Sequence, residues 1–181
     1  MPRIDIPDLD TLPPISRTIL QEIRDTGQPV ADLHVALAMS EPALAAYWAM
    51  RQAVTAHGAL PERTRFAVQL AASATGGSPY TRTVNAMLAD RAGWSTGEIA
   101  AIHQGTVPDD AHLTALLHLT QQAARHRGRV DERTWQAARR QGWSPAALLE
   151  ALALVTLVLF VDLVANTLDL VPDVPRRSAT A

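Results

Sequence analysis

The sequence contains no cysteine and no lysine, and only 4% of its residues are aromatic. Without a thiol, the chain cannot form a disulfide, a thiolate nucleophile, an iron–sulfur cluster or a cysteine-rich zinc site. Without a lysine amine, it cannot form a Schiff base or anchor pyridoxal phosphate. These two absences exclude much of redox and covalent enzyme chemistry before any pattern is considered.

Positive charge is also limited. The sixteen basic residues, all arginine, face eighteen acidic residues, so the formal net charge is -2. The densest basic run is Arg125, Arg127 and Arg129, which is typical of a solvated helix end. Because phosphate binding depends on clustered Lys and Arg, we expect no nucleic-acid partner.

No segment has the pattern of a targeting signal or a membrane span. The first residues, MPRIDIPDLDTLPP, lack the apolar run of a signal peptide, which favours a cytoplasmic location. The most apolar segment is 146–171, but its uncharged centre covers only 151–161, shorter than the ~20 residues of a span. Glu150, Asp162 and Asp169 would each cost about 2–4 kcal/mol in hydrocarbon. We therefore expect a buried helix and no membrane partner.

Apolar residues recur at spacings of three and four along most of the chain, and alternating strand patterns are missing. Proline and glycine fall between these stretches rather than inside them. The pattern predicts an all-α fold: one domain over residues 1–181, with extended tails at 1–12 and 172–181. The predicted helices are 14–27, 30–39, 41–57, 61–75, 79–92, 96–104, 110–127, 132–141 and 145–169.

A short motif occurs twice, as RAGWS at 91–95 and RQGWS at 140–144. In each copy the glycine suits the left-handed residue that ends a helix, the tryptophan can fill the corner, and the serine can cap the next helix. Ser95 with Glu98 also forms a capping-box pattern. Either any tight helix corner selects these residues, or two related helical hairpins form one bundle.

Segments 60–105 and 116–170, together with the stretch HVALAMSEP that begins at His34, resemble the carboxymuconolactone decarboxylase and alkylhydroperoxidase D-like family. The resemblance includes the region of Asn166 near the end of the last predicted helix. It implies an all-helical bundle that is commonly oligomeric. Predicted helices that are apolar on more than one side also favour a homo-oligomer.

The chain departs from this family where its redox members carry their active residues. The resemblance aligns the two cysteines of a Cys-x-x-Cys pair with Ser78 and Thr81, and the histidine with Asn85. Phe66 stands where the glutamate is expected, while Tyr80 is retained. Hydroxyl groups cannot form a disulfide or pass electrons through one. This chain is therefore not a thiol peroxidase.

Ser78, Thr81 and Asn85 are spaced to form one polar face of a helix. Ser78 before Pro79 also has the pattern of a helix N-cap. If the family's pocket persists, this face would offer donors to a small organic molecule; the alternative is a patch filled by water or by internal hydrogen bonds. The candidate pocket residues are Phe66, Ser78, Tyr80, Thr81, Asn85 and Asn166.

Asp162 interrupts an apolar stripe on the last predicted helix. Burial without a partner would raise the pKa of its carboxyl toward the range of a general acid or base. Pairing with an arginine, or setting the register at a subunit contact, is the alternative. Asp162 is our candidate catalytic residue if the protein is an enzyme.

The six histidines show no metal-ligand spacing, so we expect no metal and no cofactor. His112 and His118 fall on different helix faces, and His57 and His103 lie at predicted helix ends. Two functions stay open. One is a cysteine-independent, non-redox enzyme of lyase, isomerase or cyclase type that uses acid–base chemistry on a small organic molecule. The other is a non-catalytic small-molecule-binding or scaffolding homo-oligomer.

Overall fold

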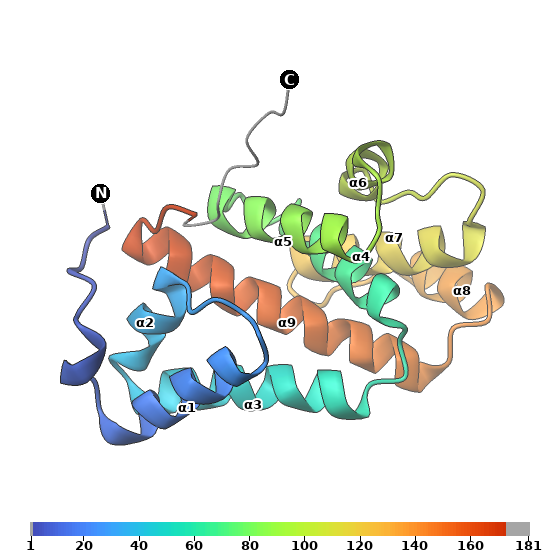
Figure 1. The fold of residues 1–181 in the computed structure, drawn as a ribbon. Helices are drawn as coiled ribbons and strands as arrows, with labels where there is room; N and C mark the ends of the chain where they lie inside the picture. Colours follow the sequence, from blue (N-terminus) through green and yellow to red (C-terminus); the bar gives the residue numbers. More distant parts are fainter. Residues whose placement is uncertain (1, 173–181) are drawn as a thin grey trace.

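The computed structural model describes residues 2–172, and residues 173–181 of the predicted tail 172–181 lie outside the described residues. Within the described range the fold is all-helical (Figure 1). The elements are a 3₁₀ turn η1 (Leu9–Thr11) and the helices α1 (Pro14–Asp25), α2 (Asp32–Ala38), α3 (Glu41–His57), α4 (Glu62–Ser73), α5 (Pro79–Arg91), α6 (Thr96–His103), α7 (Ala111–Arg125), α8 (Glu132–Arg140) and α9 (Pro145–Leu168).

The predicted helices are confirmed, with ends that differ from the predictions by no more than two residues. The expectation of an extended tail at 1–12 is wrong at its end. Residues Leu9–Thr11 form the turn η1, and the side chain of Leu12 is buried in the core. The buried side chain of Leu12 holds this segment against the bundle. The segment is too short to show a helical pattern in the sequence.

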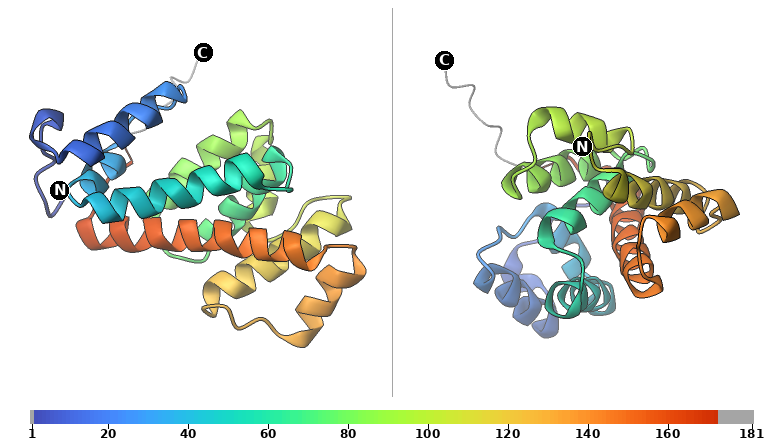
Figure 2. Two further views of the ribbon diagram at one scale, coloured as in Figure 1. Left: turned by 90° about the horizontal axis from the view of Figure 1, so that it is seen from below. Right: turned by 90° about the vertical axis from the view of Figure 1, so that its right-hand side faces the viewer.

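Helix α9 runs through the middle of the molecule and packs against α3, α4, α5 and α7 (Figures 1 and 2). Its buried side chains include Leu148, Val155 and Ala165, which belong to the core clusters. Among the described residues, α9 is the helix long and apolar enough to cross a membrane, a test that the core helix of a soluble protein also passes. Of its most apolar window of 18 residues, 39% is buried inside the described structure, and the absence of a membrane partner stays a prediction.

Both copies of the repeated motif form the predicted corners. Gly93 and Gly142 have φ values of 88° and 95°, in the left-handed region that favours glycine. Trp94 and Trp143 are buried, and their indole N–H groups donate to backbone carbonyls of earlier helices. Ser95 completes a capping box at the start of α6. These corners fix where α6 and α9 begin.

The carboxylate of Glu150 ties α9 to the turn between α3 and α4. It accepts the backbone N–H of Ala59 at 2.7 Å and that of Leu60 at 3.2 Å. Glu150→Ala is expected to lower the free energy of unfolding by about 2–3 kcal/mol, because two amides lose a charged acceptor. Denaturant unfolding measures this loss, and Glu150→Gln, which keeps one acceptor oxygen, should lose less. Equal stability of Glu150→Ala and the wild type would contradict the assignment.

Candidate functional site

A cavity of about 290 Å³ opens between α5 and α9 on one side and α2 and α3 on the other. Its walls are mostly apolar, with polar side chains at a few points, which is typical of a small-molecule site. The lining residues are Gln28, Pro29, Val30, Ala31, Leu33, His34, Tyr47, Arg51, Gln69, Tyr80, Thr81, Val84, Asn85, Met87, Leu88, Arg91, Leu157, Val158 and Val161.

The predicted polar face of α5 is present and buried. Ser78 caps the helix by accepting the backbone N–H of Thr81 at 3.3 Å, as its position before Pro79 indicates. Asn85 donates from Nδ2 to the carbonyl of Thr81 at 2.9 Å. Ser78, Thr81 and Asn85 are each at most 5% exposed. The three residues that replace the redox groups therefore form one contiguous polar cluster, of which Thr81 and Asn85 line the cavity.

Asp162 lies behind this cluster and is 4% exposed. Its Oδ1 accepts the hydroxyl hydrogen of Thr81, and its Oδ2 has no hydrogen-bond partner within the described part of the chain. Burial raises the pKa of the Asp162 carboxyl, and the hydrogen bond from Thr81 offsets part of that rise. The alternative of an arginine partner is wrong, since this side chain bonds to Thr81 instead. Asp162 does not line the cavity itself and reaches it through the Thr81 hydroxyl.

Gly76, in the turn before α5, lies against the free oxygen of Asp162. A Cβ built on Gly76 would overlap Oδ2 and Cγ of this buried side chain. Gly76→Ala is expected to displace the carboxyl and to lower the free energy of unfolding by about 1–3 kcal/mol. Thermal unfolding of Gly76→Ala measures the effect, and Gly97→Ala, where a Cβ would meet open space, is the control. If both variants melt alike, the close packing around Asp162 is not as described.

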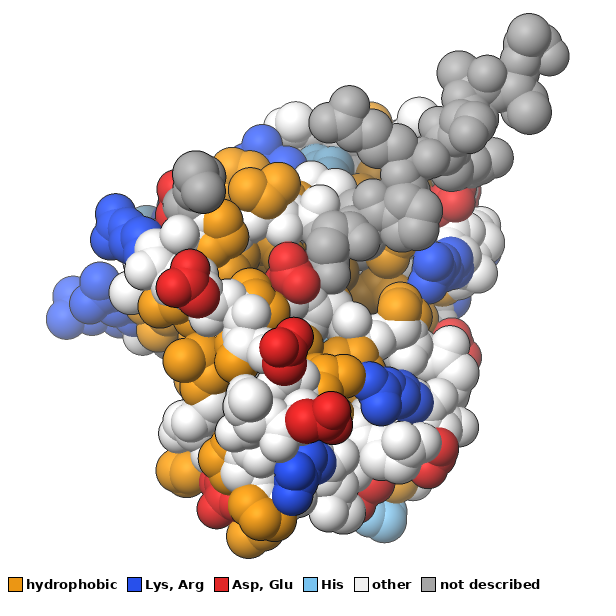
Figure 3. All heavy atoms as spheres, turned by 60° about the vertical axis from the view of Figure 1, so that its left-hand side comes forward, with side chains coloured by type: hydrophobic (Ala, Val, Ile, Leu, Met, Phe, Trp, Pro, Cys, Tyr) orange, Lys and Arg blue, Asp and Glu red, His pale blue; other side chains and the backbone are white. Residues whose placement is uncertain are grey.

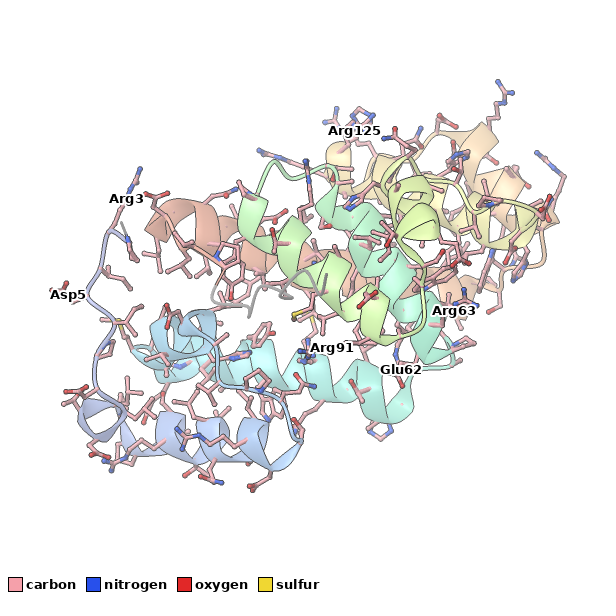
Figure 4. The ribbon with its side chains drawn as sticks, turned by 45° about the horizontal axis from the view of Figure 1, so that its top comes forward. Arg3, Asp5, Glu62, Arg63, Arg91 and Arg125 are labelled. Carbon is pink, nitrogen blue, oxygen red and sulfur yellow. The ribbon has the colours of Figure 1, made fainter. Side chains whose placement is uncertain are left out.

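The cavity carries two cations and no acidic counterpart. Arg51 of α3 and Arg91 of α5 both line it, whereas none of its described lining residues is Asp or Glu. Arg51 donates to Oε1 of Gln28 at 3.0 Å, and Arg91 reaches from the end of α5 toward α3 (Figure 4). A cavity with two guanidinium groups has a positive potential that attracts an anion.

Three of the predicted pocket residues, Phe66, Ser78 and Asn166, do not line the cavity. Phe66 is half-buried on α4 and Asn166 is exposed on α9, and both lie outside the cavity wall. Phe66 stands where the resemblance places a glutamate, and Asn166 lies one turn beyond Asp162, where α9 faces solvent. Tyr80 lines the cavity as predicted and is 3% exposed.

Several residues that line the cavity were not among the predicted pocket residues, chiefly His34, Tyr47, Arg51 and Arg91. A signal for the two arginines existed. Arg51 follows Tyr47 by four residues on α3, and Arg91 follows Met87 by four on α5, so each lies on the same face as an apolar lining residue. Neither spacing shows by itself that the two helices face the same cavity.

Two of the histidines lie at helix ends, as their positions predict. His57 and His103 are the last residues of α3 and α6. Burial, with a smaller contribution from the charge of Arg82, lowers the pKa of His103. Within residues 2–172, no group of three or more His, Asp or Glu side chains is placed to hold a metal ion. On the face shown in Figure 3, acidic and basic side chains alternate with apolar ones and form no dense basic patch.

The fold and this cluster define an all-helical protein of the alkylhydroperoxidase D-like type without its cysteines. The model of the Carboxymuconolactone decarboxylase family matches residues 41–122, which are 82 of the 181 residues of the chain. The resemblance seen in the sequence is thereby confirmed. A search of curated proteins found no match.

Solved structures share the fold at low sequence identity. An uncharacterized peroxidase-related protein with an alkylhydroperoxidase core, from Ralstonia eutropha JMP134, superposes with a TM-score of 0.83 at 19% identity over 95% of this chain and 92% of that one. A peroxidase-related protein from Silicibacter sp. TM1040 gives 0.80 at 16% identity, over 95% and 92%. A variant of the debrominase Bmp8 in complex with 2,3,4-tribromopyrrole gives 0.74 at 14% identity, over 86% and 84%. At these identities the likeness establishes the fold.

Proposed function

We propose that this protein is a cysteine-independent, non-redox enzyme that binds a small organic anion in the cavity and moves a proton on it. The reaction type would be that of a lyase, isomerase or cyclase. One observation carries the proposal: Thr81 lies on the cavity wall and donates its hydroxyl to the buried Asp162, whose other oxygen has no partner among the described residues. A carboxyl with a raised pKa accepts and returns a proton more readily near neutral pH.

The arrangement allows a proton relay in two linked transfers. A proton leaves the bound molecule for Oγ1 of Thr81, while the hydroxyl proton of Thr81 passes to Oδ1 of Asp162. The negative charge of Asp162 is neutralised, and the electron pair of the broken bond stays on the bound molecule. The reverse transfers return a proton at another position or after a bond has broken. Thr81 lies in the first turn of α5, where the helix dipole favours negative charge on its oxygen.

The two arginines supply the anion specificity. Arg51 and Arg91 line the same cavity as Thr81, and a carboxylate held there would direct the rest of the molecule along the apolar wall toward α5. The structural relative Bmp8 supports a small-molecule role for this fold, since its structure holds 2,3,4-tribromopyrrole.

The test combines binding with proton exchange. A thermal-shift screen of small carboxylates, lactones and phenols identifies ligands, because a compound at a hundred times its Kd stabilises the fold by ~2.7 kcal/mol. The compounds that bind are then incubated in D2O, and proton NMR follows deuterium incorporation. We expect carboxylates to bind, Arg51→Met to weaken them, and exchange to exceed a blank without protein. Binding without exchange across the panel would instead support the non-catalytic binding protein.

The protein is also proposed to form a homo-oligomer. Leu149 and Leu163 on the outer side of α9 are 67% and 68% exposed, unusual for large apolar side chains on a core helix. Light scattering at micromolar concentration should give at least twice the 19.5 kDa mass of the chain. Leu163→Glu should lower that mass, and a monomeric wild type would contradict the proposal.

A further inference from the structure

The exposure of the lining side chains shows at which end the cavity opens. Thr81 and Asn85, on the wall that α5 forms, are 2% and 5% exposed. Gln28 and Arg51 are half-buried, and Arg91 is exposed. The cavity therefore has its floor at the polar cluster of α5. Its mouth lies between α3 and the end of α5, beside the loop that joins α1 and α2.

A second hollow lies on the outer side of α3 and adjoins this mouth. Its wall includes Trp48, Gln52 and His57 of α3. Among the described residues, Gln28 and Arg51 are the two that line both the hollow and the cavity. Arg51 donates to Oε1 of Gln28 at 3.0 Å. This hydrogen bond therefore separates the hollow from the cavity.

The segment 28–30, between α1 and α2, is tied to the rest of the molecule by few polar contacts. Across the part of the chain that the structure describes, the backbone groups of Gln28, Pro29 and Val30 make no hydrogen bond to another backbone group. The hydrogen bond from Arg51 ties the side chain of Gln28 to α3. A segment without a backbone ladder opens at a low free-energy cost, so the loss of this one bond is enough to release it.

We propose that small molecules enter the cavity from the outer hollow, past the Arg51–Gln28 pair, and that the segment 28–30 is a strap that closes this entrance. Arg51 and Arg91 lie at the entrance, and neither wall includes Asp or Glu among its described residues. The entrance therefore admits anions faster than cations.

An entering anion also favours the open strap. A carboxylate or sulfonate accepts a hydrogen bond from a guanidinium more strongly than an amide oxygen does, so it competes with Gln28 for Arg51. When the anion takes this donor, Gln28 and its segment lose their tie to α3. Entry through this route does not depend on whether the protein is a catalyst.

The test measures how fast reagents reach a single thiol inside the cavity. Because the chain has no cysteine, one introduced cysteine is the only thiol. Val84→Cys places it on the cavity wall, three residues after Thr81, whereas Thr83→Cys places it on the exposed side of the same helix. The probes are two methanethiosulfonates, one with a sulfonatoethyl and one with a trimethylammonioethyl group. Each labelling rate of Val84→Cys is divided by that of Thr83→Cys with the same reagent.

After this correction, the anionic reagent should label Val84→Cys about tenfold faster than the cationic one, and Arg51→Met should reduce this preference. Gln28→Ala should raise the rates of both reagents about three- to tenfold, the value of one hydrogen bond. The matched control is Gln52→Ala, which changes the wall of the hollow but not that of the cavity, and it should leave the rates unchanged.

Equal rates for the two reagents, no acceleration in Gln28→Ala, or the same acceleration in Gln52→Ala would each overturn the proposal. If Val84→Cys does not fold, Val161→Cys on the α9 wall takes its place as the reporter. A thiol that stays unlabelled in both reporters, even with Gln28→Ala, would also contradict the route. The labelling requires no bound ligand, so a failed thermal-shift screen would count against the proposed function and not against this entrance.

Discussion

Asp162→Asn is expected to be more stable than the wild type at pH 7 and to have lost proton exchange. The wild-type carboxyl is buried with one oxygen unpartnered, so ionisation places a negative charge where little compensates it. Asparagine keeps the shape and the acceptor for Thr81 but carries no charge. We expect the free energy of unfolding to rise by about 1–2 kcal/mol. In a chain of this length, each kcal/mol of added stability raises Tm by about 2–4 °C.

The dependence on pH follows from the direction of the shift. Folding raises the pKa of Asp162 above its ordinary value of 3.8. Between that value and the folded pKa, the folded protein holds a proton that the unfolded chain has released, so the free energy of unfolding falls as pH rises through this window and levels off above it. In Asp162→Asn this part of the fall is absent. The two stability curves should therefore converge near pH 4 and separate toward neutral pH.

The measurement is thermal or denaturant unfolding of both proteins from pH 4 to pH 8. The matched control is Asp5→Asn, the same change of charge at an exposed residue of the N-terminal segment (Figure 4). It should follow the wild-type curve. If Asp162→Asn were less stable than the wild type at pH 7, the carboxylate would have a structural partner and the proposed role would lose its basis. Deuterium exchange by Asp162→Asn should fall by at least ~10²-fold.

Local chemistry explains why the helices could be predicted so closely from the sequence. Ser78, Ser95 and Ser144 cap the helices where their positions predict, and glycines end the preceding ones where a left-handed residue is needed. Each of these signals is complete within a few residues of the chain. Tertiary packing did not override them, because the apolar stripes of the same helices point to the same arrangement.

The site could be predicted only where one helix carries it. Ser78, Thr81 and Asn85 share a face of α5, and that cluster is present. The contact between Thr81 and Asp162 joins residues 81 positions apart, and no local pattern specifies it. Likewise, periodicity places Asp162 on an apolar stripe but does not show that α5, rather than an arginine, lies opposite.

The convergence of His34, Arg51 and Arg91 depends on how three helices pack. The local sequence around each residue does not mark it as part of a site. His34 lies in the first turn of α2, Arg51 within α3 and Arg91 at the end of α5. Their common property is the cavity that they line. Phe66 and Asn166 do not line the cavity, because a position in a family pattern or on an apolar stripe does not show where the cavity wall ends.

Thr81→Val is expected to abolish exchange while the anion still binds. Valine has nearly the shape of threonine but no hydroxyl, so Asp162 loses its hydrogen bond and the relay loses its middle group. The pKa of Asp162 should rise further, because the interaction that lowers it is gone. A second unpartnered oxygen should reduce the free energy of unfolding by about 1–3 kcal/mol, and exchange should fall by about 10²–10⁴-fold.

Thr81→Ser restores the hydroxyl and should recover most of the exchange and stability, which makes it the matched control. The double variant Thr81→Val with Asp162→Asn tests whether the two side chains act together: its loss of exchange should be close to that of either single variant, not to their product. A carboxylate that the thermal-shift screen finds to bind the wild type should also bind all of these variants, because Arg51 and Arg91 are unchanged. Exchange that persists in Thr81→Val would mean that the proton reaches the bound anion by another route, and the relay through Thr81 would be wrong.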